Sequence, residues 1–364
     1  MITVNVNLAS CGYPIRIGSG LLDRAGDEFT ALTRGTRASI VTDANVGPLY
    51  AARLADSLSR CGVDSAIFTI RAGEAAKSMD SVRDLYDRLA ERRHARGEPV
   101  IALGGGVVGD VTGFVAATWM RGVPLIQIPT TLEADLDAAV GGKTAVNHAA
   151  GKNLIGAFHQ PELVLIDVDC LSTLANRDFT AALAESVKHA VIEGDEFVQW
   201  HERHVDQIRN RDSATTIELI RRNCETKAAI VASDERERSV ESVGRAALNL
   251  GHTMGHALEV ASGYELRHGE AVSLGLIVAM DLAVRWVGFD EAIRQRIERL
   301  IGALGLTLRV KTALNRGVIA GFLEVDKKRG QSGIRFVLPR RLGELCWHNC
   351  PGSNELSKSL DRID

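Results

Sequence analysis

Two lysine-containing stretches of this chain hold residue types that could bind an anion. Lys143 belongs to a Gly-Gly-Lys-Thr sequence, and Lys152 belongs to a Gly-Lys-Asn sequence shortly after it. Glycine lets the backbone come close to a bound group, and lysine supplies a compact positive charge with three donors. The spacing is not that of a P-loop, because the first glycine of that motif is missing six positions before Lys143. These residues predict a site for a phosphorylated, polyhydroxylated small molecule.

A second group of residues could bind a metal ion. His252 and His256 are one helical turn apart, so both could face one site. A pair of this kind is more often a surface or core pair, but His268 begins the next predicted helix. Glu185 lies in an apolar helical segment, where a carboxylate is costly unless it is paired or binds a cation. Together these groups resemble the ligand set of a catalytic zinc ion. The apolar neighbours of Lys188 predict partial burial beside Glu185, whereas spacing alone would allow an exposed ion pair.

A glycine-rich turn follows the strand predicted at residues 99–103. The segment from Gly104 to Asp110 opens a helix whose first N–H groups could hold a pyrophosphate. It is not a regular G-x-G-x-x-G sequence, so a tight strand-to-helix turn explains it equally well. Polar side chains also follow the other predicted strands, at the edge where open α/β sheets bind dinucleotides. They are Asp43, Asn45, Glu74, Lys77, Thr130 and Thr131.

Strands and helices alternate in the part of the chain that must position these groups. Apolar strands are predicted at 1–6, 38–42, 64–70, 99–103, 125–129 and 163–167, and helices at 48–61 and 78–92. This alternation predicts an α/β domain with a Rossmann-like parallel sheet over residues 1–167. Longer helical patterns then predict a mainly α-helical domain over residues 168–364, and we expect the ligand site in a cleft between the two domains.

Composition limits the function classes. A chain of 364 residues, with 45% apolar and 24% charged residues, is typical of a globular protein with two domains. A net charge of -3 predicts no nucleic-acid partner. No apolar run is long enough to span a membrane, and the first residues lack the features of a signal peptide. The six scattered cysteines favour the reducing cytoplasm over a disulfide framework.

Taken in order along the chain, these motifs resemble the 3-dehydroquinate synthase family of the sugar phosphate cyclase superfamily. The resemblance covers nearly the whole chain. It rests on residues 104–110, 129–131, 141–144 and 151–153, Glu185 with Lys188, residues 248–252 with His256, the His-Gly-Glu sequence at 268–270, and the Asp-Lys-Lys sequence at 326–328.

The resemblance implies roles for individual residues. A zinc (or cobalt) ion would be held by Glu185, His252 and His268. The catalytic groups would be His256, Asn249, Lys188, Asp137 and Lys143. The substrate contacts would be Arg121, Lys143, Lys152, Asn153, Lys188, Lys227, Arg245, Asn249 and Lys327, or Lys328 in place of Lys327. The NAD contacts would be Asp43, Asn45, Glu74, Lys77, Gly105, Gly106, Val107, Val108, Gly109, Asp110, Thr130, Thr131, Lys143, Lys152 and Thr173.

The family's activity is the NAD- and metal-dependent cyclisation of 3-deoxy-D-arabino-heptulosonate 7-phosphate to 3-dehydroquinate. The resemblance implies oxidation of the C5 hydroxyl by NAD, β-elimination of phosphate, return of the hydride and an aldol ring closure, so no NADH accumulates. It also implies a cytoplasmic homodimer. The main rival is an amino-dehydroquinate synthase. A metal-dependent polyol dehydrogenase fits less well, because the chain has many phosphate-suited lysines.

Two features depart from the family pattern. Glu133 and Asp135 stand where the family has apolar or neutral residues, and extra carboxylates would weaken phosphate binding unless they point away. Roughly four extra residues precede Arg245, a change that a loop can accommodate, and they leave its placement relative to Lys227 open. From their charged neighbours alone, Lys227 and Arg245 would lie on solvated helix faces.

Overall fold

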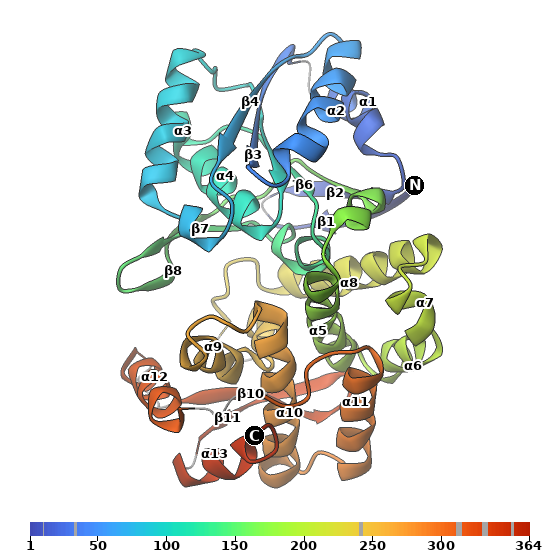
Figure 1. The fold of residues 1–364 in the computed structure, drawn as a ribbon, viewed down its shortest axis with the longest axis vertical. Helices are drawn as coiled ribbons and strands as arrows, with labels where there is room; N and C mark the ends of the chain where they lie inside the picture. Colours follow the sequence, from blue (N-terminus) through green and yellow to red (C-terminus); the bar gives the residue numbers. More distant parts are fainter. Residues whose placement is uncertain (10, 33–34, 240–242, 311–314, 330–333, 351–352) are drawn as a thin grey trace. The chain divides into compact units, whose positions relative to one another are not determined.

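The computed structural model describes the chain except residues 10, 33–34, 240–242, 311–314, 330–333 and 351–352. Only the backbone is described at residues 324–329, 353–355 and 357. The chain divides into two compact units, which are described separately below (Figure 1). Unit 1 contains Met1–Leu174 and Ile220–Ala232, and unit 2 contains Ala175–Leu219 and Ser233–Asp364.

Unit 1 is built on a seven-stranded sheet in the order β1-β2-β9-β6-β5-β3-β4. All neighbouring strands are parallel except β1 and β2. The Rossmann-like parallel sheet is therefore confirmed, with one additional strand, β2, that was not predicted. The strands are β1 (Ile2–Asn7), β2 (Gly12–Gly18), β3 (Arg37–Asp43), β4 (Asp64–Ile70), β5 (Val100–Gly104), β6 (Leu125–Pro129) and β9 (Leu163–Asp167).

Helices cover both faces of this sheet (Figure 1). Helices α1 (Ala25–Leu32) and α2 (Gly47–Arg60) pack on one face, and α3 (Met79–Glu91) and α4 (Gly106–Thr118) pack on the other. Successive residues of one strand pack into different hydrophobic cores. In β3, Ile40 packs in a cluster with Leu54 of α2, and Val41 packs in a cluster with Val111 of α4. Continuous apolar strands are typical of a parallel sheet that is buried on both faces.

Between β6 and β9 the chain forms smaller elements. These are a π-helical turn, η4 (Ala134–Ala138), and an antiparallel hairpin of β7 (Lys143–His148) and β8 (Gly151–Phe158). The lysine-containing stretches of the sequence therefore lie on a hairpin, which was not predicted. Short 3₁₀ helices complete the unit: η1 (Leu22–Arg24), η2 (Glu74–Ala76), η3 (Trp119–Arg121) and η5 (Val168–Thr173).

Unit 2 is mainly helical, and its centre is α10 (His268–Val287), which is buried along most of its length. Helices α5 (Asn176–Glu193) and α9 (His252–Ala261) and the strand β10 (Arg335–Arg341) pack against it. The other elements are α6 (Asp195–Arg203), α7 (Val205–Arg209), η6 (Gly244–Asn249), α11 (Glu291–Ala303), α12 (Arg316–Arg329), β11 (Glu344–Asn349) and α13 (Ser353–Leu360).

Helix α8 (Ser213–Ser233) is divided between the units. Its residues 220–232 belong to unit 1, where Cys224 Sγ donates to the carbonyl oxygen of Asp135 at 3.4 Å. Unit 1 is consequently not formed by one continuous stretch of chain. Among the described residues, no helix combines the length and the apolar character that crossing a membrane requires.

Candidate active site

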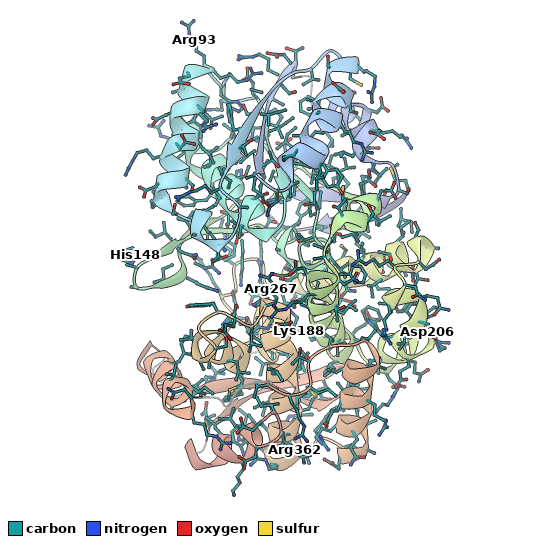
Figure 2. The ribbon with its side chains drawn as sticks, in the orientation of Figure 1. Arg93, His148, Lys188, Asp206, Arg267 and Arg362 are labelled. Atoms are coloured by element: carbon teal, nitrogen blue, oxygen red, sulfur yellow. The ribbon has the colours of Figure 1, made fainter. Side chains whose placement is uncertain are left out.

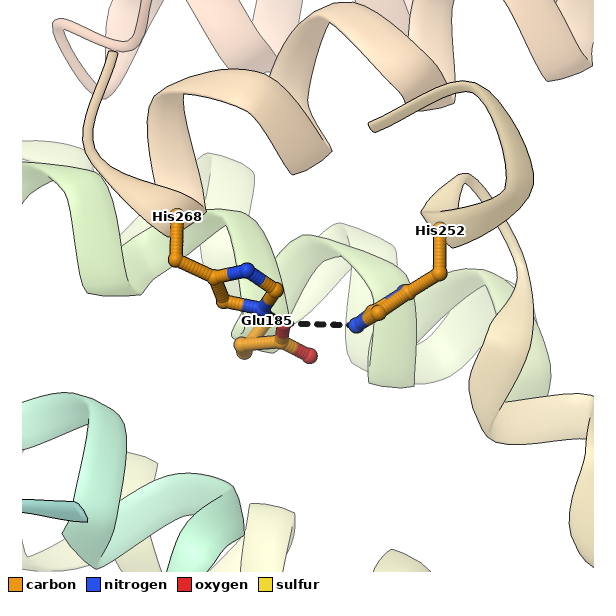
Figure 3. Close-up of side chains that lie close together, drawn as sticks. All are labelled: Glu185, His252 and His268. Carbon is orange, nitrogen blue, oxygen red and sulfur yellow. Dashed lines mark ion pairs between the residues drawn. The ribbon is translucent and has the colours of Figure 1, made fainter. Parts of the chain in front are cut away.

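The three residues predicted to bind a metal ion lie together in unit 2 (Figure 3). Glu185 lies in the middle of α5, and His252 and His268 are the first residues of α9 and α10. Nε2 of His252 is 3.3 Å from Oε1 of Glu185, and Nε2 of His268 is 3.4 Å from the same oxygen. One ligand atom of each residue lies within 4.8 Å of the others.

Two glycines of α10 let these three helices approach closely. A Cβ atom on Gly269 would lie 1.9 Å from the carbonyl oxygen of Ala181 in α5, and one on Gly275 would lie 2.1 Å from that of Gly251. Any larger residue would push the start of α10 away from α5, or away from the start of α9. The close packing of the helix backbones therefore fixes where His252 and His268 stand relative to Glu185.

The other ring nitrogens of the two histidines show why this cluster fits a cation. Nδ1 of His252 lies 3.2 Å from the carbonyl oxygen of Leu250, and Nδ1 of His268 lies 3.6 Å from a carboxylate oxygen of Glu259. A neutral ring that places its proton on Nδ1 turns the lone pair of Nε2 toward Glu185. Two acceptors that face each other require either another proton or a cation between them. One carboxylate and two imidazoles are the donors of many catalytic zinc sites.

Electrostatics keep Glu185 ionised although it is buried. Its side chain is 1% exposed and forms an ion pair with Lys188, which is also 1% exposed (Figure 2). Burial alone would raise the pKa of Glu185, but Lys188, His252 and His268 outweigh it and hold the pKa well below its usual range. The predicted partial burial of Lys188 is confirmed and is in fact nearly complete. An ordinary acidic residue of the same unit, such as Asp206, is exposed to solvent.

Two further residues of this cluster were not found from the sequence. His189 is fully buried one turn after Glu185, and a ring nitrogen lies within 4.8 Å of a carboxylate oxygen of Glu185. Glu259 is 7% exposed and faces His268. The spacing of four residues between Glu185 and His189 was visible in the sequence, whereas Glu259 looks like an ordinary polar residue of a helix.

The predicted proton-transfer residues of unit 2 lie beside this cluster or on the segment leading to it. The ring of His256 is exposed, and its centre lies 5.5 Å from that of His252 and 6.0 Å from that of His268. Asn249 ends η6, three residues before His252, and its amide donates to Glu237 at 3.2 Å.

The interpretation of Arg245 as a residue on a solvated helix face is wrong. Its side chain is 1% exposed, and Nη1 donates to the carbonyl oxygen of Glu235 at 2.7 Å. Asp234 closes the longer loop, because its carboxylate accepts the backbone N–H groups of Arg238 and Arg245 at 2.8 and 3.3 Å. The local charge pattern could not show this, because burial here depends on the packing of η6.

In unit 1 the predicted cofactor residues gather at the carboxyl edge of the sheet. The strand order changes direction between β3 and β5, and open α/β sheets bind nucleotides in the crevice at such a point. Asp43 ends β3 there, and its carboxylate accepts the backbone N–H of Asn45 at 2.8 Å. Gly105 and Gly106 follow β5 and begin α4. Val107, Val108, Gly109 and Asp110 form the first turns of that helix.

The remaining cofactor candidates lie around this point. Lys77 forms a buried ion pair with Asp110. The carboxylate of Glu74 accepts the amide of Asn147 at 2.7 Å. Burial raises the pKa of Asp110 above its usual value, and Lys77 opposes that shift.

Threonines from two loops lie at the same edge. Thr130 and Thr131 directly follow β6, and the backbone N–H of Thr130 donates to the carbonyl oxygen of Gly104 at 3.1 Å. Thr173 lies in η5, after β9, and its hydroxyl is 2.7 Å from that of Tyr50. The carboxyl ends of parallel strands lie at one edge of a sheet. Asp43, Thr130 and Thr173 lie at this edge, as expected.

Lys227 is also buried rather than solvated, so its interpretation as an exposed residue is wrong. It is 5% exposed, and its ammonium group contacts the Oδ1 atom and the carbonyl oxygen of Asp137 at 2.8 and 2.6 Å. These two predicted site residues are far apart in the sequence. They meet because the second part of α8 packs in unit 1.

Other predicted substrate residues are less closely grouped. Lys143 and Lys152 lie on β7 and β8 and are exposed, and Asn153 has a positive φ of 57° on β8. Arg121 ends η3, beyond the C-terminal end of α4, about 20 Å along the helix from the glycine turn. Unit 1 therefore does not bring Arg121 to the carboxyl edge of the sheet. The side chains of Lys327 and Lys328, in α12, lie outside the described residues.

The two unusual carboxylates of the sequence have different surroundings. Asp135 is 1% exposed within η4, and burial raises its pKa well above the usual value. Its side chain therefore points into the protein rather than into solvent. Glu133, just before η4, is half-buried.

Comparison with known proteins links both units to one family. A family model described as the N-terminal part of 3-dehydroquinate synthase matches residues 67–181, and a model of its C-terminal part matches residues 182–329. A 3-dehydroquinate synthase of Desulforamulus reducens is 45% identical over 346 residues, which cover 95% of each chain.

Solved structures of two other synthases have similar folds. A 2-epi-5-epi-valiolone synthase from Streptomyces hygroscopicus, solved with NAD⁺ and Zn²⁺, has a TM-score of 0.87 and 28% identity over 97% of each chain. A 2-deoxy-scyllo-inosose synthase, solved with carbaglucose-6-phosphate, NAD⁺ and Co²⁺, has a TM-score of 0.90 and 24% identity over 99% of each chain.

Proposed function

Because the chain belongs to the 3-dehydroquinate synthase family, we propose that it converts 3-deoxy-D-arabino-heptulosonate 7-phosphate to 3-dehydroquinate with release of phosphate. The observation that carries this proposal is the convergence of Glu185, His252 and His268 in unit 2. We assign a zinc or cobalt ion to these residues and NAD to the carboxyl edge of the sheet in unit 1. This division of roles was expected for domains at 1–167 and 168–364, whereas unit 1 also contains residues 168–174 and 220–232.

When bound, NAD would exchange a hydride with C5 of the substrate, and the metal ion would act as a Lewis acid toward the C5 oxygen. The residues of the chain have the tasks of binding and proton transfer. Lys143, Lys152 and Asn153 are assigned to the anionic substrate, with Lys327 as a further cation. Lysines serve as point charges there, while an arginine can bind an oxyanion with two hydrogen bonds.

The buried cations of the site have a second task, which is to hold acidic groups in place. Lys188 keeps Glu185 ionised, and Lys227 fixes Asp137. A preorganised set of charges stabilises developing charge without having to rearrange during the reaction. His256, exposed beside the two metal-binding histidines, and Asn249 are assigned to proton transfer. Arg245, buried and fixed by Glu235, is assigned to the substrate.

At the cofactor edge, the N-terminus of α4 offers backbone N–H groups from Gly106 onward to the pyrophosphate. Asp43 and Glu74 are suited to hydroxyl groups of the nucleotide. Lys77 forms an ion pair with Asp110, the fifth residue of α4. The other assigned contacts are Asn45, Gly105, Val107, Val108, Gly109, Thr130, Thr131 and Thr173.

A direct assay tests this function. Purified protein with NAD and zinc should release phosphate from 3-deoxy-D-arabino-heptulosonate 7-phosphate without accumulating NADH, because the hydride is returned. Formation of one NADH per substrate would instead indicate a polyol dehydrogenase. The same assay with an aminated analogue, sedoheptulose 7-phosphate and glucose 6-phosphate would separate the proposed enzyme from other cyclases. Faster turnover of any of these would replace the proposed substrate.

Two further assignments follow from the family and the composition. We propose that the enzyme is a homodimer, which sedimentation of the purified protein would test. We also propose that it acts in the cytoplasm, which agrees with cysteines that are scattered rather than arranged as a disulfide framework.

A further inference from the structure

Glu259 is a buried carboxylate that has no assigned role in the proposed reaction. It lies in α9, two turns after His252, and is 7% exposed. Its Oε2 atom is 3.6 Å from Nδ1 of His268, the nitrogen that points away from Glu185. A buried carboxylate destabilises a protein unless polar or charged groups compensate for the lost water. The contact with His268 provides such compensation and also acts on the orientation of that ring.

In both histidines of the cluster Nδ1 faces an oxygen atom, within hydrogen-bond distance in His252 and slightly beyond it in His268. In His252 the Nδ1 atom faces the carbonyl oxygen of Leu250 at 3.2 Å, and in His268 it faces Glu259. In both rings Nε2 faces Oε1 of Glu185. An acceptor beside Nδ1 favours the proton on that nitrogen and leaves the Nε2 lone pair for a metal ion.

We propose that Glu259 is a positioning residue that fixes the ring orientation and the tautomer of His268, so that Nε2 is presented to the metal ion. This proposal rests on the proposed function, because it presupposes an ion held by Glu185, His252 and His268. Of the two acceptors, only Glu259 is a side chain, so only this one can be removed by substitution.

A second role for the same residue has to be distinguished. Ligand atoms of His256, Glu259 and His268 also lie within 4.8 Å of one another, so Glu259 could be a ligand of a second ion. His268 would then have to use Nδ1 for this ion while Nε2 serves the first. A ring that binds two cations must lose both protons, which a neutral imidazole resists near pH 7. The positioning role needs no such step.

The test measures metal binding in the absence of NAD and substrate. The affinity of Glu259→Ala for zinc, measured by competition with a chromogenic chelator, should fall by about 10–100-fold, as is typical for outer partners of metal-binding histidines. Glu259→Gln retains an acceptor oxygen and should lose less affinity than Glu259→Ala. It also serves as the readout if the alanine variant does not fold. The absorption spectrum of bound Co²⁺ should change in both variants.

Glu98 in unit 1 provides a matched control. It is also poorly exposed, and its carboxylate lies 3.5 Å from Nδ1 of the buried His94. Glu98→Gln should therefore change the stability of the protein but leave its zinc affinity as in the wild type. The control separates the general effect of losing a buried Glu–His contact from an effect on the metal ion.

Three outcomes would decide against the proposals. Unchanged zinc affinity in both Glu259 variants would overturn the positioning role while leaving the proposed function intact. Two ions per wild-type chain and one per Glu259→Ala chain would also overturn it and make Glu259 a ligand. If the wild type binds zinc no better than His268→Ala, the metal site itself fails and the positioning role fails with it.

Discussion

Buried and half-buried carboxylates in the two units differ in the number of lysine and histidine side chains around them. In unit 1, Asp135 is buried within η4, and no described group donates a hydrogen bond to its Oδ1 atom. Asp110, in the same unit, has an ion pair with Lys77. In unit 2, Glu185 faces Lys188 together with the imidazoles of His252 and His268.

The pKa values of these carboxyl groups follow the number of partners. Burial raises the pKa of Asp135 well above its usual value, and it raises that of Asp110 despite the opposing effect of Lys77. For Glu185 burial also acts upward, but Lys188 and the histidines bring the pKa well below the usual range. The comparison teaches that burial does not decide the charge of an acid by itself. Of these three carboxyl groups, only the one beside a lysine and two imidazoles is held in the ionised form that binds a cation.

The largest effect should follow from removing the charge of Glu185. Glu185→Gln keeps the shape of the side chain but takes away the anionic ligand, so bound zinc and phosphate release should fall together. We expect a loss greater than the ~10–100-fold that outer partners of a metal site produce. His268→Ala should show the same joint loss. Metal analysis and the phosphate assay check this, and full activity with unchanged metal content would reject the ligand assignment.

A smaller effect is expected when each carboxylate loses its lysine. Lys77→Met leaves the half-buried Asp110 without its ion-pair partner and should cost at most about 3 kcal/mol of unfolding free energy, the lower end of the range for a fully buried pair. Lys188→Met should cost less in the presence of zinc, because the ion and two histidines still face Glu185. Denaturant unfolding of both variants measures the difference. An equal or larger cost for Lys188→Met would contradict the view that the histidine cluster compensates the charge of Glu185.

The next prediction concerns Asp135 and pH. Its folded-state pKa lies above the unfolded value of about 3.9, so the unfolded chain releases this proton first as pH rises. The contribution of this group to stability is fully present below the unfolded pKa and is lost as pH rises through the folded pKa. Asp135→Asn cannot ionise and should be more stable than the wild type at pH 8, by about 1–2 kcal/mol.

Unfolding measured at several pH values tests this effect of Asp135. The difference in stability between Asp135→Asn and the wild type should shrink as the pH approaches 4. A difference that is independent of pH would show that Asp135 does not change its charge on folding.

The smallest effect is expected for Tyr50 in unit 1, whose uncharged hydroxyl group serves as a reference for the charged side chains. The hydroxyl of Tyr50 donates to the carbonyl oxygen of Cys170 at 3.0 Å and lies 2.7 Å from the hydroxyl of Thr173. Tyr50→Phe should cost about 1 kcal/mol, and it should weaken NAD binding slightly if Thr173 contacts the cofactor. Thermal unfolding and an NAD titration check both effects. A loss of stability as large as that of Lys77→Met would show that the charge of the removed group does not determine how much stability is lost.

The sequence was most informative where local rules apply. Apolar strands alternating with helices led to the parallel sheet, and the sheet placed Asp43 and the glycine turn at one edge. The residues proposed to bind a metal ion were selected from a helical spacing together with the family resemblance, and the structure brings them together. Strand β2 was missed because glycine and proline interrupt its apolar pattern, and the β7–β8 hairpin because its glycines looked like a loop.

Long-range packing explains what the sequence could not show. Lys227 is buried because α8 returns to unit 1, where it meets Asp137. Arg245 is buried against its own loop. The role proposed for Glu259 depends on α9 facing the first residue of α10, which no local periodicity encodes. For Lys227 and Arg245 the local charge pattern suggested solvent, and contacts with residues outside their own helix decided otherwise.

The path of the chain through α8 has a consequence for biosynthesis. The first 174 residues leave the ribosome without residues 220–232, the helical part that unit 1 needs. At about 5–20 residues per second, the missing segment follows roughly 3–12 seconds later. During this interval unit 1 lacks the helical part whose Cys224 and Lys227 contact Asp135 and Asp137 of η4. A chaperone that binds emerging chains would find its target in this window, and a gene split after codon 174 would yield an incomplete first half.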